Sequence, residues 1–69
     1  MKGATINMSI GKKLATLRGK KSMPETAEAL GVSLSAYVKY ERNERVPRDE
    51  IKVKIANYYG KTVQEIFFN

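Results

Sequence analysis

Two short helical segments with only three residues between them define the stretch SMPETAEALGVSLSAYVKYE, residues 22–41. Ser22 is followed three residues later by Glu25, which is the pattern of a capping box at the start of a helix. Gly31 predicts the end of this helix, because glycine readily adopts the left-handed backbone that a tight turn needs. Ser33 is a good N-cap for a second helix. The stretch therefore predicts helix, tight turn and helix.

The second helix, residues 34–42, has two different sides. At about 100° per residue, Tyr37, Tyr40 and Glu41 continue the apolar stripe of the preceding helix and are expected to pack inward. Asn43 is expected to end the helix, since Asn tolerates a positive φ. The outward side carries Leu34, Ser35, Val38, Lys39 and Arg42. A short helix that is held by a tight turn and displays one face has the geometry of a helix-turn-helix, whose second helix enters the DNA major groove.

Three further helices are predicted around this pair. Apolar residues at helical spacing predict one helix that ends at Gly19 and another between Pro47 and Gly60. Thr62 and Glu65 form a second capping box, which predicts a short last helix. With no strand signal and no internal repeat, the chain is predicted to be a compact all-α domain of five helices.

Length and charge limit the class of protein. The 69 residues allow one domain, and we expect a flexible lead-in at residues 1–8, with Met8 as an alternative start, before a domain at residues 9–69. Thirteen Lys and Arg against seven Asp and Glu give a net charge of +6. The first 22 residues contain bases but no acid, so the excess is expected to form one positive surface. The expected partner is a polyanion, nucleic acid before anionic membrane.

Composition also argues against several classes of function. The chain has neither Cys nor His, which removes disulfides, thiolate metal sites and the commonest general base. No spacing joins a nucleophile to an oriented base, so no catalytic residue, metal or cofactor is predicted, and the protein is not expected to be an enzyme. No apolar run is long enough to span a membrane, and MKGATINMSIGKK lacks the apolar core of a secretory signal. We therefore expect a soluble cytoplasmic protein.

Residues 9–68 resemble the Cro/repressor-type helix-turn-helix family, also called the Xre family, with the motif at residues 23–42. The resemblance rests on Ala27 where the two helices touch, the turn glycine Gly31, the core positions Leu30 and Val32, the pair Tyr40-Glu41, the loop residues Arg45 and Pro47, and the final VxxIF pattern. It implies a lambda-repressor-like five-helix domain. It also implies a partly buried ion pair between Arg18 and Glu41.

The resemblance further implies which residues touch double-stranded DNA. Base contacts are expected from Leu34, Ser35, Val38 and Lys39, of which Lys39 suits guanine and Leu34 a thymine methyl group. The backbone N–H groups of Ser22 and Met23 would hold a phosphate at a helix N-terminus. Further phosphate contacts are expected from Lys20, Lys21, Tyr37, Arg42, Asn43, Arg45 and Arg48.

Four features depart from the family pattern. Met23 stands where the family usually has a DNA-contacting Gln, and RGKKS is about two residues shorter than the common form. Tyr37 replaces an aliphatic residue, so either the core accommodates its ring or its hydroxyl reaches a phosphate. Leu34 and Val38 make the outward face unusually apolar, as in protein contact surfaces.

Three functions are compared on this basis. The first is a sequence-specific regulator of phage-repressor or Cro type, or of a mobile element. It would act as a homodimer. The apolar end Ile66, Phe67 and Phe68 is one candidate dimer surface, although at least one of the two phenylalanines is expected in the core. The second is a protein-interaction module on the same fold, an antirepressor or antitoxin, using Leu34 and Val38. The third, a binder of anionic membranes through IGKKLATLRGKK, is weaker, because that stripe is better explained as a packing face.

Overall fold

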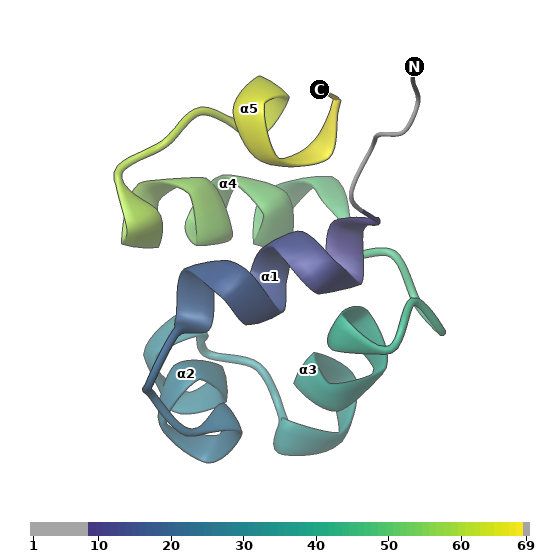
Figure 1. Cartoon of the computed structure of the whole chain (residues 1–69), viewed down its shortest axis with the longest axis vertical. Helices are drawn as coiled ribbons and strands as arrows, with labels where there is room; N and C mark the ends of the chain where they lie inside the picture. The colour runs from purple at the N-terminus through teal and green to yellow at the C-terminus, as the bar shows by residue number, and fades with distance from the viewer. Residues whose placement is uncertain (1–8, 69) are drawn as a thin grey trace.

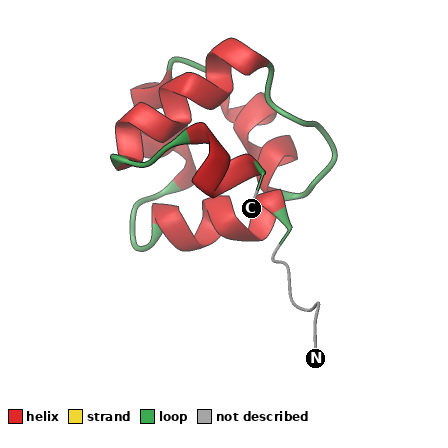
Figure 2. Ribbon diagram, turned by 90° about the horizontal axis from the view of Figure 1, so that it is seen from above, coloured by secondary structure: helices red, strands yellow, loops and turns green. Residues whose placement is uncertain are grey.

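The structure, a computed structural model, describes residues 9–68. The expected lead-in with Met8 lies outside the described residues, as does Asn69. Within them, the chain forms five helices and no strand: α1 (Ile10–Arg18), α2 (Met23–Leu30), α3 (Leu34–Glu41), α4 (Asp49–Tyr59) and α5 (Val63–Phe67). The predicted five-helix, all-α architecture is confirmed. In Figure 1, α1 crosses the middle of the molecule, with α4 and α5 above it and α2 and α3 below it, and Figure 2 shows the same arrangement from above.

Local sequence explains where the helices begin. The hydroxyl oxygens of Ser9, Ser22, Ser33 and Thr62 each accept a backbone N–H of the helix that follows. At Thr62 the capping box is complete, because the Glu65 carboxylate accepts the Thr62 N–H in return. At Ser22 the structure forms the half in which Oγ accepts the Glu25 N–H, at 3.1 Å.

Residues with a left-handed backbone follow three of the helices, at the positions predicted. Gly31 has a φ of 73° after α2, Gly60 a φ of 66° after α4, and Asn43 a φ of 61° beyond the end of α3. Asn43 is the only non-glycine with a positive φ in the described part of the chain. A β-branched or bulky residue would be strained at any of these three positions.

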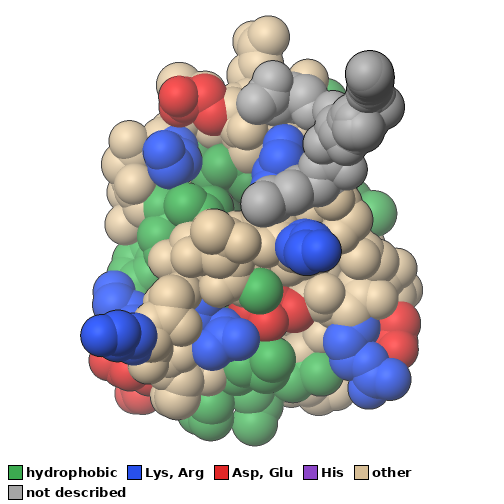
Figure 3. Space-filling model, viewed as in Figure 1, with side chains coloured by type: hydrophobic (Ala, Val, Ile, Leu, Met, Phe, Trp, Pro, Cys, Tyr) green, Lys and Arg blue, Asp and Glu red, His purple; other side chains and the backbone are tan. Residues whose placement is uncertain are grey.

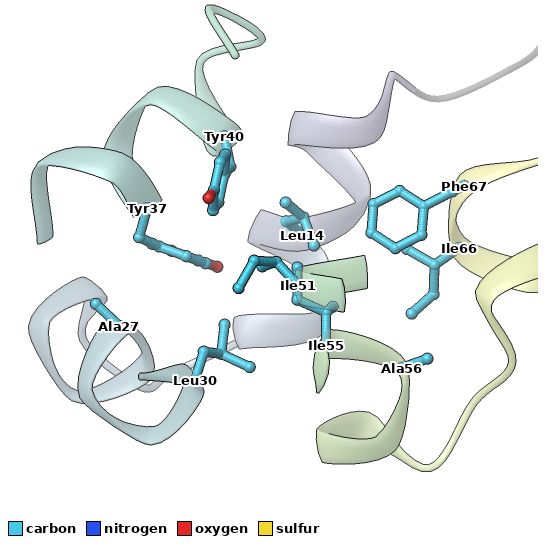
Figure 4. Close-up of a cluster of buried hydrophobic side chains, with 10 residues drawn as sticks. All are labelled: Leu14, Ala27, Leu30, Tyr37, Tyr40, Ile51, Ile55, Ala56, Ile66 and Phe67. Carbon is cyan, nitrogen blue, oxygen red and sulfur yellow. The ribbon is translucent and has the colours of Figure 1, made fainter. Parts of the chain in front are cut away.

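The core lies between the two helix layers and draws on all five helices. Leu14, Tyr37 and Ile55 are fully buried at its centre, and Figure 4 shows the Tyr37 ring pointing from α3 into the cluster. The α5 residues Ile66 and Phe67 are also buried there. The suggestion that Ile66 and Phe67 form a dimer surface is therefore wrong, because α5 uses both side chains to cover the core.

The start of α1 meets the end of α3 backbone to backbone at Gly11. A Cβ atom added to Gly11 would lie 2.1 Å from the carbonyl oxygen of Glu41. Asn43 fastens the same contact, because its Oδ1 accepts the Gly11 N–H at 3.0 Å and its Nδ2 donates to Ser9 Oγ at 3.1 Å. This junction sets the position of α3 relative to the rest of the domain.

Candidate nucleic-acid interface

The turn between α2 and α3 is three residues long, as the sequence predicted. Gly31 N–H donates to Glu28 O at 3.1 Å and Val32 N–H donates to Ala27 O at 3.0 Å, so the last carbonyls of α2 are satisfied as the chain turns. Ser33 then caps α3 through the Ala36 N–H at 3.0 Å. The two helices pack on each other through inward residues and leave one side of α3 uncovered.

The predicted base-contacting residues are not equally exposed. Leu34 is 45% exposed and Ser35 is also exposed, at the first turn of α3. Val38 and Lys39 lie one turn further along on the same side of the helix, and both are half-buried. The first turn of α3 is thus its most accessible part, and Figure 3 shows hydrophobic side chains at the lower end of the molecule, where α2 and α3 meet.

Both helices of the motif begin with free backbone donors. In α2 the Glu25 N–H goes to Ser22 Oγ and the Thr26 N–H to Ser22 O, while residue 24 is proline and has no N–H. The Met23 N–H has no acceptor among the described residues. A helix N-terminus with a free N–H carries partial positive charge and suits an anion. Although Met23 replaces the expected Gln, its backbone keeps the donor.

Arg18 and Glu41 form the expected ion pair. Arg18 Nε donates to Glu41 Oε2 at 2.6 Å, and Nη2 donates to Oε1 at 3.1 Å, so the contact is bidentate. The Glu41 side chain is 5% exposed and the Arg18 side chain 20%. The hydrogen bond to Glu41 raises the pKa of Arg18 above its ordinary value. A third bond, from Arg18 Nη1 to Lys21 O at 2.7 Å, fixes the segment that leads into α2.

Tyr37 does not reach the surface. Its side chain is fully buried, so the predicted phosphate contact by its hydroxyl is wrong and the core accommodates the ring. The ring packs edge-on against Tyr40, with centroids 6.4 Å apart. The hydroxyl has no hydrogen-bond partner among the described residues, as is also true of Tyr59. Burial raises the pKa of both tyrosines above the ordinary value.

The predicted phosphate-binding cations lie at the surface, but several have partners. Lys20 is exposed, and Lys21 Nζ donates to Tyr58 OH at 2.9 Å, a bond that raises the pKa of Lys21. Arg42 pairs with Glu44 at 3.2 Å, and Arg48 lies 4.0 Å from Glu50. Arg45 is exposed as well, and the exposed Asn43 uses its amide to hold α1.

Two positive residues in the first third of the chain have partners on other helices. Arg18 is neutralised by Glu41, and Lys13 Nζ donates to Ile66 O of α5 at 3.1 Å. In Figure 3 the Lys and Arg side chains are spread over the face that is shown. Exposed cations next to the motif include Lys20 and Lys21 before α2 and Arg42 after α3. The two lysines lie next to the N-terminus of α2, and Arg42 lies at the C-terminal end of α3.

Sequence reasoning missed three residues of this region. Gly11 gave no local signal, because its reason is the carbonyl of Glu41 on another helix. Thr26 is fully buried and donates Oγ1 to Ser22 O at 3.0 Å, which closes the first turn of α2. Tyr58 fits the apolar spacing of α4 in the sequence, yet its hydroxyl accepts a hydrogen bond from Lys21 Nζ. A tertiary partner determines the role of Gly11 and of Tyr58.

Comparison with known proteins agrees with this geometry. The family model described as HTH_3, helix-turn-helix, matches residues 9–66, which covers α1 through α4 and most of α5. No curated protein and no solved structure matches the chain. The described residues hold no group of three or more carboxylates that could bind a metal ion, and none of their helices is long and apolar enough to cross a membrane.

Proposed function

The chain belongs to the HTH_3 helix-turn-helix family, whose domains bind DNA, and we propose that it is a sequence-specific transcriptional regulator of phage-repressor or Cro type. The observation that carries this proposal is the pairing of a free α2 N-terminus with an exposed first turn of α3 across a three-residue turn. This arrangement lets one helix hold a phosphate while the next enters the major groove.

In the proposed complex, different residues of α3 contact different groups on the base edges. Ser35 is exposed and can pair with several base edges, and Leu34 offers an apolar surface to a thymine methyl group. The Lys39 side chain is half-buried and has to extend away from the helix for Nζ to reach guanine O6 or N7. Val38 is half-buried and is assigned a packing contact with the wall of the major groove.

Phosphate contacts position the domain without specifying sequence. We assign them to the Met23 N–H, Lys20, Lys21 and Arg42. Lys21 exchanges its hydrogen bond to Tyr58 OH for one to a phosphate oxygen, and Arg42 exchanges its ion pair with Glu44 for one with a phosphate. Both existing partners are exposed or half-exposed, so these exchanges cost little.

One recognition helix covers too few base pairs for a specific site, so the proposed regulator binds as a dimer. Selection from a random pool of DNA duplexes at physiological salt tests the proposal, with wild type and Lys39→Ala in parallel. The expected result is a short palindromic or repeated site for wild type that becomes less defined for the variant. If neither protein enriches a sequence, the DNA-reading function is wrong.

A second candidate function has one observation in its favour. Leu34 exposes 45% of an apolar side chain at the tip of α3, as a protein-contact surface does. An antirepressor or antitoxin would use this residue against a protein. The substitution Leu34→Ser distinguishes protein binding from DNA binding. If the partner is a protein, the variant should lose a complex that survives nuclease treatment and high salt. If the partner is DNA, the variant should change only the preferred base.

A further inference from the structure

Lys21 lies in the short connection between α1 and α2, and its backbone is held on both sides by Arg18. The Lys21 N–H donates to Arg18 O at 3.2 Å, and Arg18 Nη1 donates to Lys21 O at 2.7 Å. The same arginine is fixed by its two bonds to Glu41 of α3. Because the backbone is held in this way, the position of the Lys21 ammonium group depends on what its side chain contacts.

The Lys21 side chain contacts Tyr58 in the last turn of α4. Lys21 Nζ donates to Tyr58 OH at 2.9 Å and lies 4.7 Å from the centre of the Tyr58 ring. In Figure 1 the end of α4 and the connection between α1 and α2 lie on the same side of the molecule, at the left. The Tyr58 hydroxyl therefore lies within one lysine side chain of the residue that precedes Ser22, the N-cap of α2.

The hydroxyl of Tyr58 has an unused donor. A phenol can accept a hydrogen bond and donate one at the same time. The Tyr58 oxygen accepts from Lys21 Nζ, and the described part of the chain offers no acceptor for its hydrogen. The contact lies at the surface, with Lys21 exposed and Tyr58 half-buried. The O–H of Tyr58 can therefore donate to a molecule that approaches from solution.

The next residue, Tyr59, provides a contrast. Its ring packs against that of Tyr58, with centroids 4.8 Å apart. The Tyr59 hydroxyl is buried, however, and has no hydrogen-bond partner among the described residues. Of these two adjacent tyrosines, Tyr58 alone presents its hydroxyl at the surface beside a lysine.

An ammonium group and a phenol O–H side by side suit a DNA phosphate. The charged oxygens of a phosphate only accept hydrogen bonds, and bonds to them are stronger than bonds between neutral groups. Tyrosine is one of the side chains that contact the DNA backbone in known complexes. Lys21 is already assigned to a phosphate at the start of α2, so the Tyr58 hydroxyl lies beside an expected phosphate position.

We propose that Tyr58 is itself a DNA contact, which donates its O–H to the phosphate that binds Lys21. The inference rests on the proposed function and deepens it, because it adds the end of α4 to an interface formed by α2 and α3. Tyr58 is neutral, so its contact releases no counterion from DNA, whereas that of Lys21 does. Loss of the Tyr58 hydroxyl should therefore lower affinity without changing the salt dependence.

Binding of a labelled DNA duplex over a series of salt concentrations tests this contact. Tyr58→Phe keeps the ring beside Lys21 Nζ and removes only the hydroxyl. It should weaken binding about tenfold per bound subunit, as expected for a hydrogen bond to a charged group, at an unchanged slope of log K against log salt. Tyr59→Phe is the matched control and should bind DNA as wild type does. Thermal melts of both variants show whether the fold is retained.

A second background separates direct contact from positioning of Lys21. In Lys21→Ala protein, Tyr58→Phe should still weaken binding, because the hydroxyl touches the phosphate itself. A loss that disappears in this background, or a salt slope that falls in Tyr58→Phe, would mean that Tyr58 acts only through Lys21, and would overturn the proposal. Wild-type affinity in Tyr58→Phe, or an equal loss in Tyr59→Phe, would overturn it too.

The outcome stays separate from that of the proposed function, because phosphate contacts do not depend on sequence and a random-sequence duplex can be used. If wild type selects a DNA site and Tyr58→Phe binds as tightly as wild type, the contact is wrong and the regulator stands. If wild type selects no site but Tyr58→Phe weakens duplex binding at an unchanged slope, the contact stands and sequence reading is wrong.

Discussion

Arg18 at the end of α1 grips Glu41 at the end of α3 through two hydrogen bonds, Nε to Oε2 at 2.6 Å and Nη2 to Oε1 at 3.1 Å. Glu41 is nearly buried, so removing the arginine leaves a carboxylate with little access to water. Arg18→Met should lower the free energy of unfolding by about 2–3 kcal/mol, measured by urea denaturation. Arg42→Met is the matched control: its pair with Glu44 is mostly exposed, and its loss should cost less than about 1 kcal/mol. Equal effects of the two changes would contradict the structural role of Arg18.

The unpartnered hydroxyl of Tyr37 predicts a substitution that stabilises the domain. Tyr37→Phe removes a buried polar atom with no hydrogen-bond partner among the described residues and keeps the ring. The free energy of unfolding should rise by about 1 kcal/mol. Tyr40→Phe, at the neighbouring ring, should give no comparable gain, since its hydroxyl is not among the buried groups that lack a partner. A less stable Tyr37→Phe protein would mean that the hydroxyl has a partner, either the nearby Glu41 carboxylate or a buried water.

Alkaline pH should destabilise the protein through the same residue. Burial raises the pKa of Tyr37 above its unfolded value, which is about 10. The stabilising contribution of the neutral phenol is therefore complete below pH 10 and is lost as the pH rises above it, because the unfolded chain releases the proton first. Urea midpoints measured across this range should fall with pH, and fall less steeply in Tyr37→Phe. Identical slopes in the two proteins would exclude Tyr37 as the cause. Tyr59 and Lys21, whose pKa values are also raised, contribute in the same direction to both proteins.

Two glycines should respond differently to alanine. Gly11→Ala places a Cβ atom 2.1 Å from a backbone carbonyl oxygen that cannot rotate away, so α1 and α3 must separate, at a cost of roughly 3 kcal/mol or more. Gly60→Ala meets no atom within 4 Å but has to adopt a φ of 66°, which costs about 1–2 kcal/mol. Thermal unfolding of both variants tests the order. A milder effect at Gly11 than at Gly60 would mean that the two helices are not in backbone contact.

Salt dependence should report which cations touch DNA. Lys21→Ala and Arg42→Ala are each expected to weaken binding to all sequences and to reduce the slope of log K against log salt by about one. Lys61→Ala is the control, because Lys61 is exposed in the connection between α4 and α5. An unchanged slope for Arg42→Ala with an altered base preference would make Arg42 a base-reading residue.

How far the sequence predicts this molecule depends on the range of each interaction. Gly31, Gly60, Asn43 and the four capping residues act on their own neighbours, so the helix limits could be predicted from local pattern. The helix periodicity also placed Tyr37 inward. It could not decide the direction of the hydroxyl, because that depends on space left by other helices.

Interactions between distant residues set the limit for the site as well. Ile66, Phe67 and Phe68 have similar polarity and adjacent positions, and only the docking of α5 on the core decides which side chain remains outside. The contact between Lys13 Nζ and Ile66 O could not be predicted, because it depends on how α5 docks. The pair of Arg18 and Glu41 was expected from the family resemblance alone, since the two residues lie far apart in the sequence. The HTH motif itself could be identified because its turn, caps and apolar stripes lie within about twenty residues of each other.

The contact at Gly11 has a mechanical consequence. No side chain stands between the Gly11 Cα and the Glu41 carbonyl, so no rotamer change can absorb a displacement of α3 against α1. Asn43 fastens the start of α1 to the end of α3, and Lys13 Nζ fastens α1 to the last turn of α5. A force on α3 is therefore passed through α1 to α5 at the opposite end of the domain, two helices further along the chain. We expect a displacement imposed on α3 to shift α5 as well, because α1 connects the two helices rigidly.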